Sequence, residues 1–259
     1  MTVSNPAPQP LPFWRATLFV IAAGCLLALL SFGIRASFGL FLAPMSSEFG
    51  WGREVFAIAI ALQNLLWGLA QPVAGAFADR YGSGRVLTIG ALVYAAGLFI
   101  MANASTPGML TLSAGILVGL GVAGASFAIV LAAFTRLVSE ERRSWALGIG
   151  TAAGSAGQFL MVPLGQSFLS AYGWSMALTI FGFIALLMVP CAAALTGRPT
   201  TKYQMPQSIG VALGEAFRHP SYNFLIAGFF VCGFHVAFIQ VHLPAYITDM
   251  GLDLSLIHI

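Results

Sequence analysis

Seven long apolar runs, separated by short polar gaps, divide the chain. Each run is close to the roughly 20 residues that an α-helix needs to cross about 30 Å of hydrocarbon. The runs do not alternate every second residue, as the strands of a membrane barrel would. In lipid every backbone polar group must be paired within its own segment, so the pattern predicts seven transmembrane helices. The predicted spans cover residues 17–42, 55–78, 86–102, 109–135, 145–168, 176–196 and 222–247.

Basic residues fall in alternate gaps between these spans. The residues before the first span and in the gaps after the second, fourth and sixth are Arg15, Arg80, Arg85, Arg136, Arg142, Arg143, Arg198, Lys202 and Arg218. The remaining gaps contain Arg53 together with acidic residues. Lys and Arg resist translocation, so the basic side is expected to be cytoplasmic. This predicts an integral protein of a bacterial inner membrane with a cytoplasmic amino terminus.

The composition excludes several classes of protein. Hydrophobic residues make up 59% of the chain and charged residues 7%, a balance that soluble globular domains do not show. The net charge of +3 is spread over the predicted cytoplasmic loops, so it reports topology and not nucleic-acid binding. The sequence contains no recognisable nucleophile–base pair, metal-ligand cluster or phosphate-binding loop. We therefore expect no enzyme activity, no catalytic residues, no cofactor and no metal site.

The first six spans contain an internal repeat. A shift of 91 positions aligns Pro72 with Pro163, and it aligns residues 81–82 (Tyr-Gly) with residues 172–173 (Tyr-Gly). One matching segment contains the loop between the second and third spans, and the other contains the loop between the fifth and sixth. These two loops lie on opposite sides of the predicted membrane. Repeats of inverted topology are a recurrent construction of secondary transporters. The sequence thus predicts an all-α membrane protein, with a six-helix bundle built from two inverted three-helix repeats and a seventh helix added.

This organisation divides the chain into four predicted parts. They are a cytoplasmic tail at 1–15, the six-helix half at 16–196, a cytoplasmic linker at 197–220, and the seventh helix with its end at 221–259. The linker includes an amphipathic stretch that predicts a short interfacial helix.

The loop between the second and third spans carries a distinctive motif. Its characteristic residues are Gly75, Asp79, Arg80, Gly82, Gly84 and Arg85. The glycines permit a tight turn, and the charges can pair with a helix amino terminus or with a neighbouring loop. The spacing resembles the G-x-x-x-D-R-x-G-x-x-R loop of the major facilitator superfamily. The resemblance implies a cytoplasmic latch that favours the outward-facing state, with Gly75, Asp79, Arg80, Gly82 and Arg85 as its conformational gate.

The fifth span adds a second point of resemblance to this superfamily. It contains Gly150, Gly154 and Gly157, followed by Pro163. Small residues four positions apart let helix backbones approach closely, and proline can kink a helix. We therefore expect these residues to serve helix packing.

Two loops indicate the branch of the superfamily. Residues 136–148 and 49–54 resemble the monocarboxylate and oxalate/formate-type transporters. The resemblance covers nearly all of residues 16–250. Members of the superfamily normally have twelve helices, so it also implies a chain truncated after the seventh helix.

Arg35 is the one basic residue inside a predicted span. A charge at membrane depth costs about 2.5–3.5 kcal/mol or more, so it needs a partner, and no Asp or Glu lies within any of the seven spans. Three explanations remain open: binding of a substrate anion, a structural ion pair with Glu48, Glu54 or an acid elsewhere, or snorkelling to the outer surface. A guanidinium suits a carboxylate because it donates two parallel hydrogen bonds.

Neutral polar residues complete the predicted solute site. Asn64 in the second span and Gln158 in the fifth can serve either as glue between helices or as solute ligands. His235 in the seventh span can exchange protons near neutral pH, or it can be structural. The predicted solute-binding residues are Arg35, Asn64, Gln158 and His235.

These observations predict a secondary transporter, a symporter or antiporter, that moves a small organic anion such as a monocarboxylate by alternating access. Its expected partners are the anionic solute, the lipid bilayer and a coupling proton or counter-solute. Two alternatives remain: an efflux carrier for neutral or hydrophobic compounds, and a membrane sensor that has the fold but does not transport.

Overall fold

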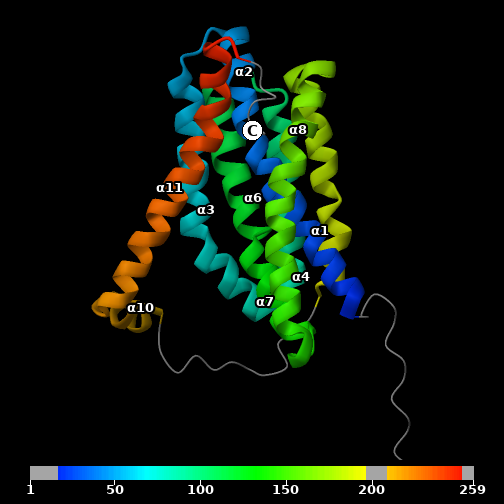
Figure 1. Ribbon diagram of the computed structural model, residues 1–259, viewed down its shortest axis with the longest axis vertical. Coiled ribbons are helices and arrows are strands. Elements are labelled where there is room, and N and C mark those ends of the chain that lie inside the picture. The colour runs from blue at the N-terminus through cyan, green and yellow to red at the C-terminus, as the bar shows by residue number, and fades with distance from the viewer. Residues whose placement is uncertain (1–16, 197–208, 253–259) are drawn as a thin grey trace, which may run out of the picture.

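The computed structural model describes residues 17–196 and 209–252, and within these ranges all regular structure is helical (Figure 1). The predicted tail at 1–15, much of the predicted linker (197–208) and the predicted truncated end beyond residue 252 lie outside the described residues. In chain order the elements are α1 (Thr17–Ala36), the 3-10 helix η2 (Ser37–Phe41), α2 (Leu42–Phe49), α3 (Arg53–Tyr81), α4 (Ser83–Met101), α5 (Pro107–Leu110), the π-helix η3 (Thr111–Leu117), α6 (Val118–Gly124), α7 (Phe127–Leu137), α8 (Glu140–Leu186), α9 (Met188–Ala194), α10 (Ile209–Arg218) and α11 (Pro220–Asp249).

Six helical stretches of the described chain are long and apolar enough to cross a membrane. The longest, Glu140–Ala194, has 55 residues and leaves helical geometry at Gly173, where φ is 79° and ψ is 171°. Gly173 separates the predicted fifth and sixth spans, so the six stretches of the described chain correspond to the seven predicted spans. The predicted all-α membrane fold is confirmed.

Two spans differ from their predicted form. The first helix does not stop at residue 42 but continues through η2 and α2 to Phe49. The fourth span is interrupted at Ala125–Ser126, where Ser126 is extended (φ −79°, ψ 148°) and its hydroxyl accepts the amide hydrogen of Ile129 at 3.4 Å. A side chain at Gly90 of α4 would collide with the Ala125 backbone, so α4 crosses directly against this break. The hydropathy pattern does not predict this break, because the residues on both sides of it are apolar.

The core of the bundle surrounds α1. Leu27, Ile34 and Phe41 are fully buried along α1 and η2, and Tyr94 from α4 and Phe181 from α8 are buried with them. α1 packs against α8, α9 and α7. Apolar side chains alone do not hold helices together in lipid, so close packing of this kind has to supply the stabilisation.

α11 packs differently from the other long helices. Its buried side chains, among them Val241, Pro244 and Ala245, lie near its carboxyl end, where it contacts η2 and α2. Figure 1 shows the rest of α11 leaning away from the bundle toward α10. We refer to the two ends of the molecule by the ends of α3. The Arg53 end is where α11 meets the bundle, and the Asp79 end is where the two diverge.

Candidate solute-binding site

Arg35 lies in the last turn of α1 and brings three helices together. One terminal nitrogen, Nη2, donates a hydrogen bond to Oδ1 of Asn64 on α3. The other, Nη1, lies 3.5 Å from Oε1 of Gln240 on α11. The guanidinium carbon is 4.6 Å from the centre of the Trp67 ring, also on α3, close enough for a cation–π interaction. The guanidinium is therefore directed into the bundle and does not snorkel to the surface.

The surroundings of Arg35 are polar but neutral. The ion pairs among the described residues are formed by other arginines, and none involves Arg35. Glu48, one of its predicted partners, instead accepts a hydrogen bond from the indole of Trp174. The Nε atom of Arg35 is buried and has no hydrogen-bond partner. A buried donor without an acceptor costs free energy, so the site has capacity to bind a further acceptor.

Gln240 links Arg35 to the fifth crossing helix. Its amide nitrogen donates to Oε1 of Gln158 on α8 at 2.8 Å. Gln158 and Gln240 also line a cavity of about 240 Å³ between η2, α8 and α11. Apart from these two side chains, its lining is formed by Ala36, Leu40, Phe159, Val162, Ile239, Leu243 and Pro244. The cavity is thus apolar, with its amides on the side of Arg35.

A second set of hydrogen bonds fixes the ring beneath Arg35. The indole nitrogen of Trp67 donates to Oε1 of Gln71 at 3.1 Å, and the amide nitrogen of Gln71 donates to the hydroxyl of Ser126 at 2.8 Å. Phe32 packs edge-on against the same indole, with ring centres 6.2 Å apart. These contacts keep the indole N–H away from Arg35, so the ring presents its face to the guanidinium. The break in the fourth span supplies the Ser126 hydroxyl.

The structure gathers three of the four predicted solute residues, Arg35, Asn64 and Gln158. His235 is exposed, and its Nδ1 lies 2.9 Å from the carbonyl oxygen of Val231 in the preceding turn of α11. Its role in the solute pathway stays a prediction. Gln240 was missed by the sequence analysis, although it is a strongly polar residue in an apolar span. It follows His235 by five residues, which places it about 140° away around the helix.

The motif between α3 and α4 is organised around Asp79. Asp79 forms an ion pair with Arg136 of α7, and Arg136 also donates to the hydroxyl of Ser83 at 3.4 Å. Arg80 lies over the ring of its neighbour Tyr81, 5.4 Å from the ring centre. The sequence analysis expected the charges of this loop to pair with a helix amino terminus or a neighbouring loop. In the observed ion pair the charge from the loop is the carboxylate of Asp79, and its partner is an arginine of α7. Asp79 faces α7 from the last turn of α3, where Arg136 can reach it.

The remaining residues of the motif shape the turn. Gly82 has φ 96° and ψ 142°, a conformation that favours glycine and lets α4 begin directly after α3. A side chain at Gly84 would collide with the carbonyl oxygen of Ala192 on α9 at 2.8 Å, so α4 and α9 approach closely there. Gly75 has open space beside it, and Arg85 is exposed. The gate role of Gly75, Asp79, Arg80, Gly82 and Arg85 stays a prediction.

The predicted packing glycines lie where α8 crosses α1. A side chain at Gly157 would collide with the backbone carbonyl of Leu29, and one at Gly33 would lie 2.5 Å from the carbonyl oxygen of Gly157. Gly150 instead faces α7, where a Cβ atom would lie 2.9 Å from the ring of Phe134. The backbones of α1 and α8 therefore touch without side chains between them, as small residues permit.

The other two residues of this set are less constrained. A Cβ atom at Gly154 would meet only Phe32, at an ordinary 3.9 Å. Pro163 lies inside α8, whose only non-helical backbone angles are at Gly173. The hydroxyl of Ser167 donates to the carbonyl oxygen of Pro163 at 2.9 Å.

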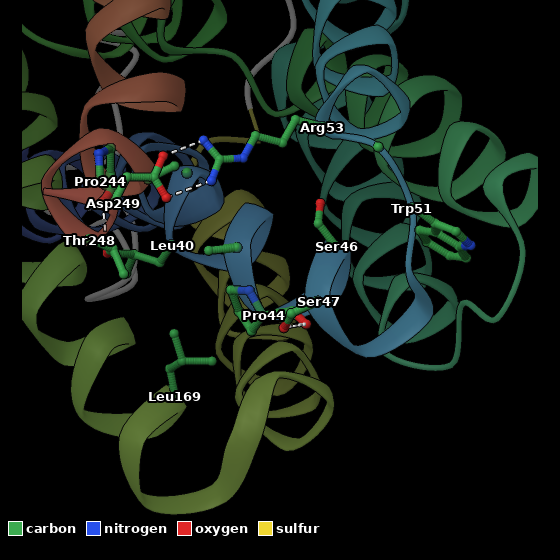
Figure 2. A pocket seen from close by; sticks show the side chains of 14 residues that line it. Leu40, Pro44, Ser46, Ser47, Trp51, Arg53, Leu169, Pro244, Thr248 and Asp249 are labelled. Atoms are coloured by element: carbon green, nitrogen blue, oxygen red, sulfur yellow. Dashed lines mark hydrogen bonds and ion pairs between the residues drawn. The ribbon is translucent and has the colours of Figure 1, made fainter. Parts of the chain in front are cut away.

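A larger cavity opens at the Arg53 end (Figure 2). It has a volume of about 700 Å³ and lies between η2, α2, α8 and α11. Figure 2 shows Arg53 and Asp249 facing one another across its edge, and their two parallel hydrogen bonds measure 2.5 and 2.6 Å. A side chain at Gly39 would collide with the carbonyl oxygen of Gln240, so η2 and α11 are in backbone contact here. The ion pair and this backbone contact hold the end of α11 against the bundle, with the cavity beside them.

Comparison with known proteins agrees with this architecture. The sequence profile of the Major Facilitator Superfamily matches residues 15–259. Monocarboxylate transporter 11 of Mus musculus is 30% identical over 233 residues, covering 86% of this chain and 50% of that protein. The human protein of the same name is 30% identical over 261 residues, covering 97% of this chain and 54% of the relative.

A bacterial relative is more distant. The uncharacterized MFS-type transporter YcxA of Bacillus subtilis is 23% identical over 246 residues, covering 91% of this chain and 59% of the relative. The chain spans about half the length of the curated relatives it matches. Both the family and these relatives point to a transporter and not to an enzyme. The chain is an integral membrane protein that belongs to the major facilitator superfamily, and it resembles the monocarboxylate transporter branch.

Proposed function

We propose that this chain forms the anion-binding part of a secondary transporter that moves a small monocarboxylate or similar organic anion by alternating access. The observation that carries the proposal is Arg35. It is a partly buried cation whose partners are neutral amides and the face of a ring, and its buried Nε is unpaired. The names of the mammalian relatives give independent support for a monocarboxylate.

The chemistry favours an anion over a neutral solute. An amide oxygen carries only a partial charge, so Asn64 and Gln240 compensate the guanidinium incompletely in a medium of low dielectric. A carboxylate supplies a full negative charge and two acceptor oxygens, which match the fork of the guanidinium. The apolar cavity beside Gln158 and Gln240 would take the hydrocarbon part of such a solute. Arg35 would hold the charged end.

The position of α11 supports access from one side at a time. α11 is closed against the bundle at the Arg53 end and diverges from it toward the Asp79 end. With the orientation that the basic loops predict, the Asp79 end is cytoplasmic, and this arrangement corresponds to an inward-facing state. The loop containing Gly75, Asp79, Arg80, Gly82 and Arg85 would then be the inner gate. Transport would be coupled to a proton or to a counter-solute, and His235 is the candidate residue to bind the proton.

The test is binding of pyruvate to the chain in lipid nanodiscs, read from tryptophan fluorescence and from thermal stabilisation. Arg35→Gln should weaken binding by roughly 10- to 150-fold, because it removes charge-assisted hydrogen bonds worth about 1.5–3 kcal/mol. Arg35→Lys retains the charge but loses the planar fork, so it should give an intermediate loss. Pyruvamide, the neutral analogue, should bind weakly to all three proteins.

The matched control is Gln166→Leu, a partly buried glutamine on α8 about two turns beyond Gln158, whose amide nitrogen donates to Ser170 and not to the site. An equal loss of pyruvate and pyruvamide binding in Arg35→Lys would make Arg35 structural and overturn the anion assignment. Saturable pyruvate counterflow in proteoliposomes separates a carrier from a sensor. Pyruvate that binds without counterflow would mark this chain as a binding unit that does not transport by itself.

A further inference from the structure

Gln240 makes two side-chain hydrogen bonds, and both cross between helices. Its oxygen faces Nη1 of Arg35 on α1 at 3.5 Å, and its nitrogen donates to Gln158 on α8 at 2.8 Å. It thus ties α11 to α1 and α8, two of the helices that carry predicted solute residues. The hydrogen-bonded sequence runs from Gln158 through Gln240 and Arg35 to Asn64.

The bond from Arg35 to Gln240 is weak for its position. A distance of 3.5 Å is at the limit for a hydrogen bond, whereas charge-assisted bonds to a carboxylate measure about 2.7–2.9 Å. The side-chain amide presents one neutral oxygen where a carboxylate presents two charged ones. A solute carboxylate therefore competes with Gln240 for the same donors and gains more from them.

The cavity beside this bond has room for such a competitor. Its volume of about 240 Å³ is about eight times the 30 Å³ that a water molecule occupies in the liquid. Gln240 and Gln158 form its polar side. A carboxylate of a few heavy atoms can enter it, and its charged group then meets the position that the Gln240 oxygen occupies.

Gln240 lies where the packed end of α11 meets its exposed part, and Val241, Pro244 and Ala245 beyond it are buried. The backbone of α11 touches η2 at Gly39, and the ion pair between Arg53 and Asp249 lies nine residues beyond Gln240, at the end of the helix. Toward the Asp79 end, the side chains of α11 are largely exposed. Loss of the Gln240 contacts would leave α11 attached only near its carboxyl end.

We propose that Gln240 is a positioning residue that acts as an internal ligand of Arg35: a solute carboxylate replaces its amide oxygen, and this exchange loosens α11 from α1 and α8. Solute occupancy is thereby linked to the position of α11, because the solute and Gln240 compete for one partner. The inference rests on the proposed function, since it takes an anion at Arg35 as the displacing group.

Two substitutions at Gln240 should change pyruvate affinity in opposite directions. Gln240→Leu removes the competitor at similar volume, so pyruvate should bind roughly threefold to tenfold more tightly. Gln240→Glu provides a permanent internal carboxylate for Arg35, so pyruvate binding should weaken by at least about tenfold. The same two changes at Gln166 serve as controls and should leave the affinity within about twofold.

The position of α11 provides a second measurement that does not depend on solute binding. Spin labels are attached to Cys232 of α11 and to a cysteine introduced at the exposed Leu69 of α3 (Leu69→Cys), with Cys25 and Cys191 replaced by alanine. The distance distribution between the labels should broaden in Gln240→Leu without pyruvate, and in the parent protein on addition of pyruvate. In Gln240→Glu it should be narrow and insensitive to pyruvate.

The outcomes separate the two proposals. If both Gln240 variants bind pyruvate more weakly, or both bind it unchanged, Gln240 is not a displaced ligand and this inference is overturned, while the Arg35 assignment stands. If the parent protein binds no pyruvate and Gln240→Leu binds none either, the proposed function fails. If, in addition, the distance distribution between the labels is the same in Gln240→Leu as in the parent protein, Gln240 does not hold α11 against α1 and α8, and this inference fails as well.

Discussion

α8 and α11 contact the same part of the molecule, α1 and η2, but in opposite ways. α8 crosses α1 through Gly157 and Gly33, where backbone touches backbone with no side chain between them. α11 also touches the backbone of η2 at Gly39, but it adds polar contacts, Gln240 toward Arg35 of α1 and Asp249 toward Arg53 of α3. The α8 contact with α1 thus depends on shape, whereas the α11 contact also depends on hydrogen bonds and an ion pair.

The difference indicates which contact can change during function. Two helix backbones that touch at glycines pack closely in only one relative position. Moving the helices apart loses all of the dispersion contacts between them at once. Polar contacts can be exchanged for water or for a solute with little net loss. The α1–α8 contact therefore behaves as a permanent part of the bundle, whereas the α11 contact is suited to repeated opening.

Gly157→Val should have the largest effect, because it breaks the permanent contact. The new side chain would collide with the carbonyl group of Leu29, which cannot move without displacing α1. Overpacking of this kind costs about 3 kcal/mol, which corresponds to a fall of about 6–12 °C in the unfolding temperature. The measurement is a thermal unfolding curve in detergent. Gly154→Ala, which meets only Phe32 at 3.9 Å, is the control and should unfold at or above the parent temperature.

Arg53→Glu should have an intermediate effect, because it breaks the exchangeable contact at its charged end. Repulsion from Asp249 should open the cavity shown in Figure 2, and a cysteine at its lining residue Ser46 (Ser46→Cys) should react severalfold faster with a polar maleimide. Unfolding temperature should change little, since both side chains are about half exposed.

The charge-swapped double variant, Arg53→Glu with Asp249→Arg, is the control for this experiment. It should restore slow labelling at Ser46→Cys, and high salt should weaken that restoration because the pair is solvent-exposed. Fast labelling in both the single and the double variant would show that the ion pair does not close this end.

Asp79→Asn should have the smallest effect. Its ion pair with Arg136 joins α3 to α7, two helices of the same bundle, and the carboxylate is about half exposed. Exposed pairs contribute about 1 kcal/mol or less, so the unfolding temperature should fall by less than about 4 °C. Labelling of Ser46→Cys should change less than twofold. A larger change there would show that this loop acts on α11, as the latch implied by the family resemblance requires.

The sequence was most informative about the helices. Their length and composition are dictated by the thickness of the bilayer, which leaves little freedom, and the fold class followed from them. The breaks within helices were not predictable. Ser126 interrupts an apolar span because α4 crosses beside it at Gly90, a tertiary contact that leaves no trace in hydropathy.

The candidate site was predicted in part. Arg35 was identifiable because a charge in an apolar span is conspicuous, and the amides Asn64 and Gln158 followed as the polar residues of neighbouring spans. Gln240 was not predicted, whereas His235 was, because an imidazole can exchange protons near neutral pH and a neutral amide has no such signature. The pairing of Asp79 with Arg136 depends on how the last turn of α3 faces α7, and loop charges do not reveal that direction.

The turn at Gly173 has a mechanical consequence. The fifth and sixth crossings are joined through a single left-handed residue, so there is no slack between them and neither can slide along the other. Beyond the turn, Gly182 lies directly against Phe99 of α4. Gly157 holds the arm that carries Gln158 against α1, so both arms of this hairpin are anchored in the bundle, and α11 is the partner that has to move past Gln158.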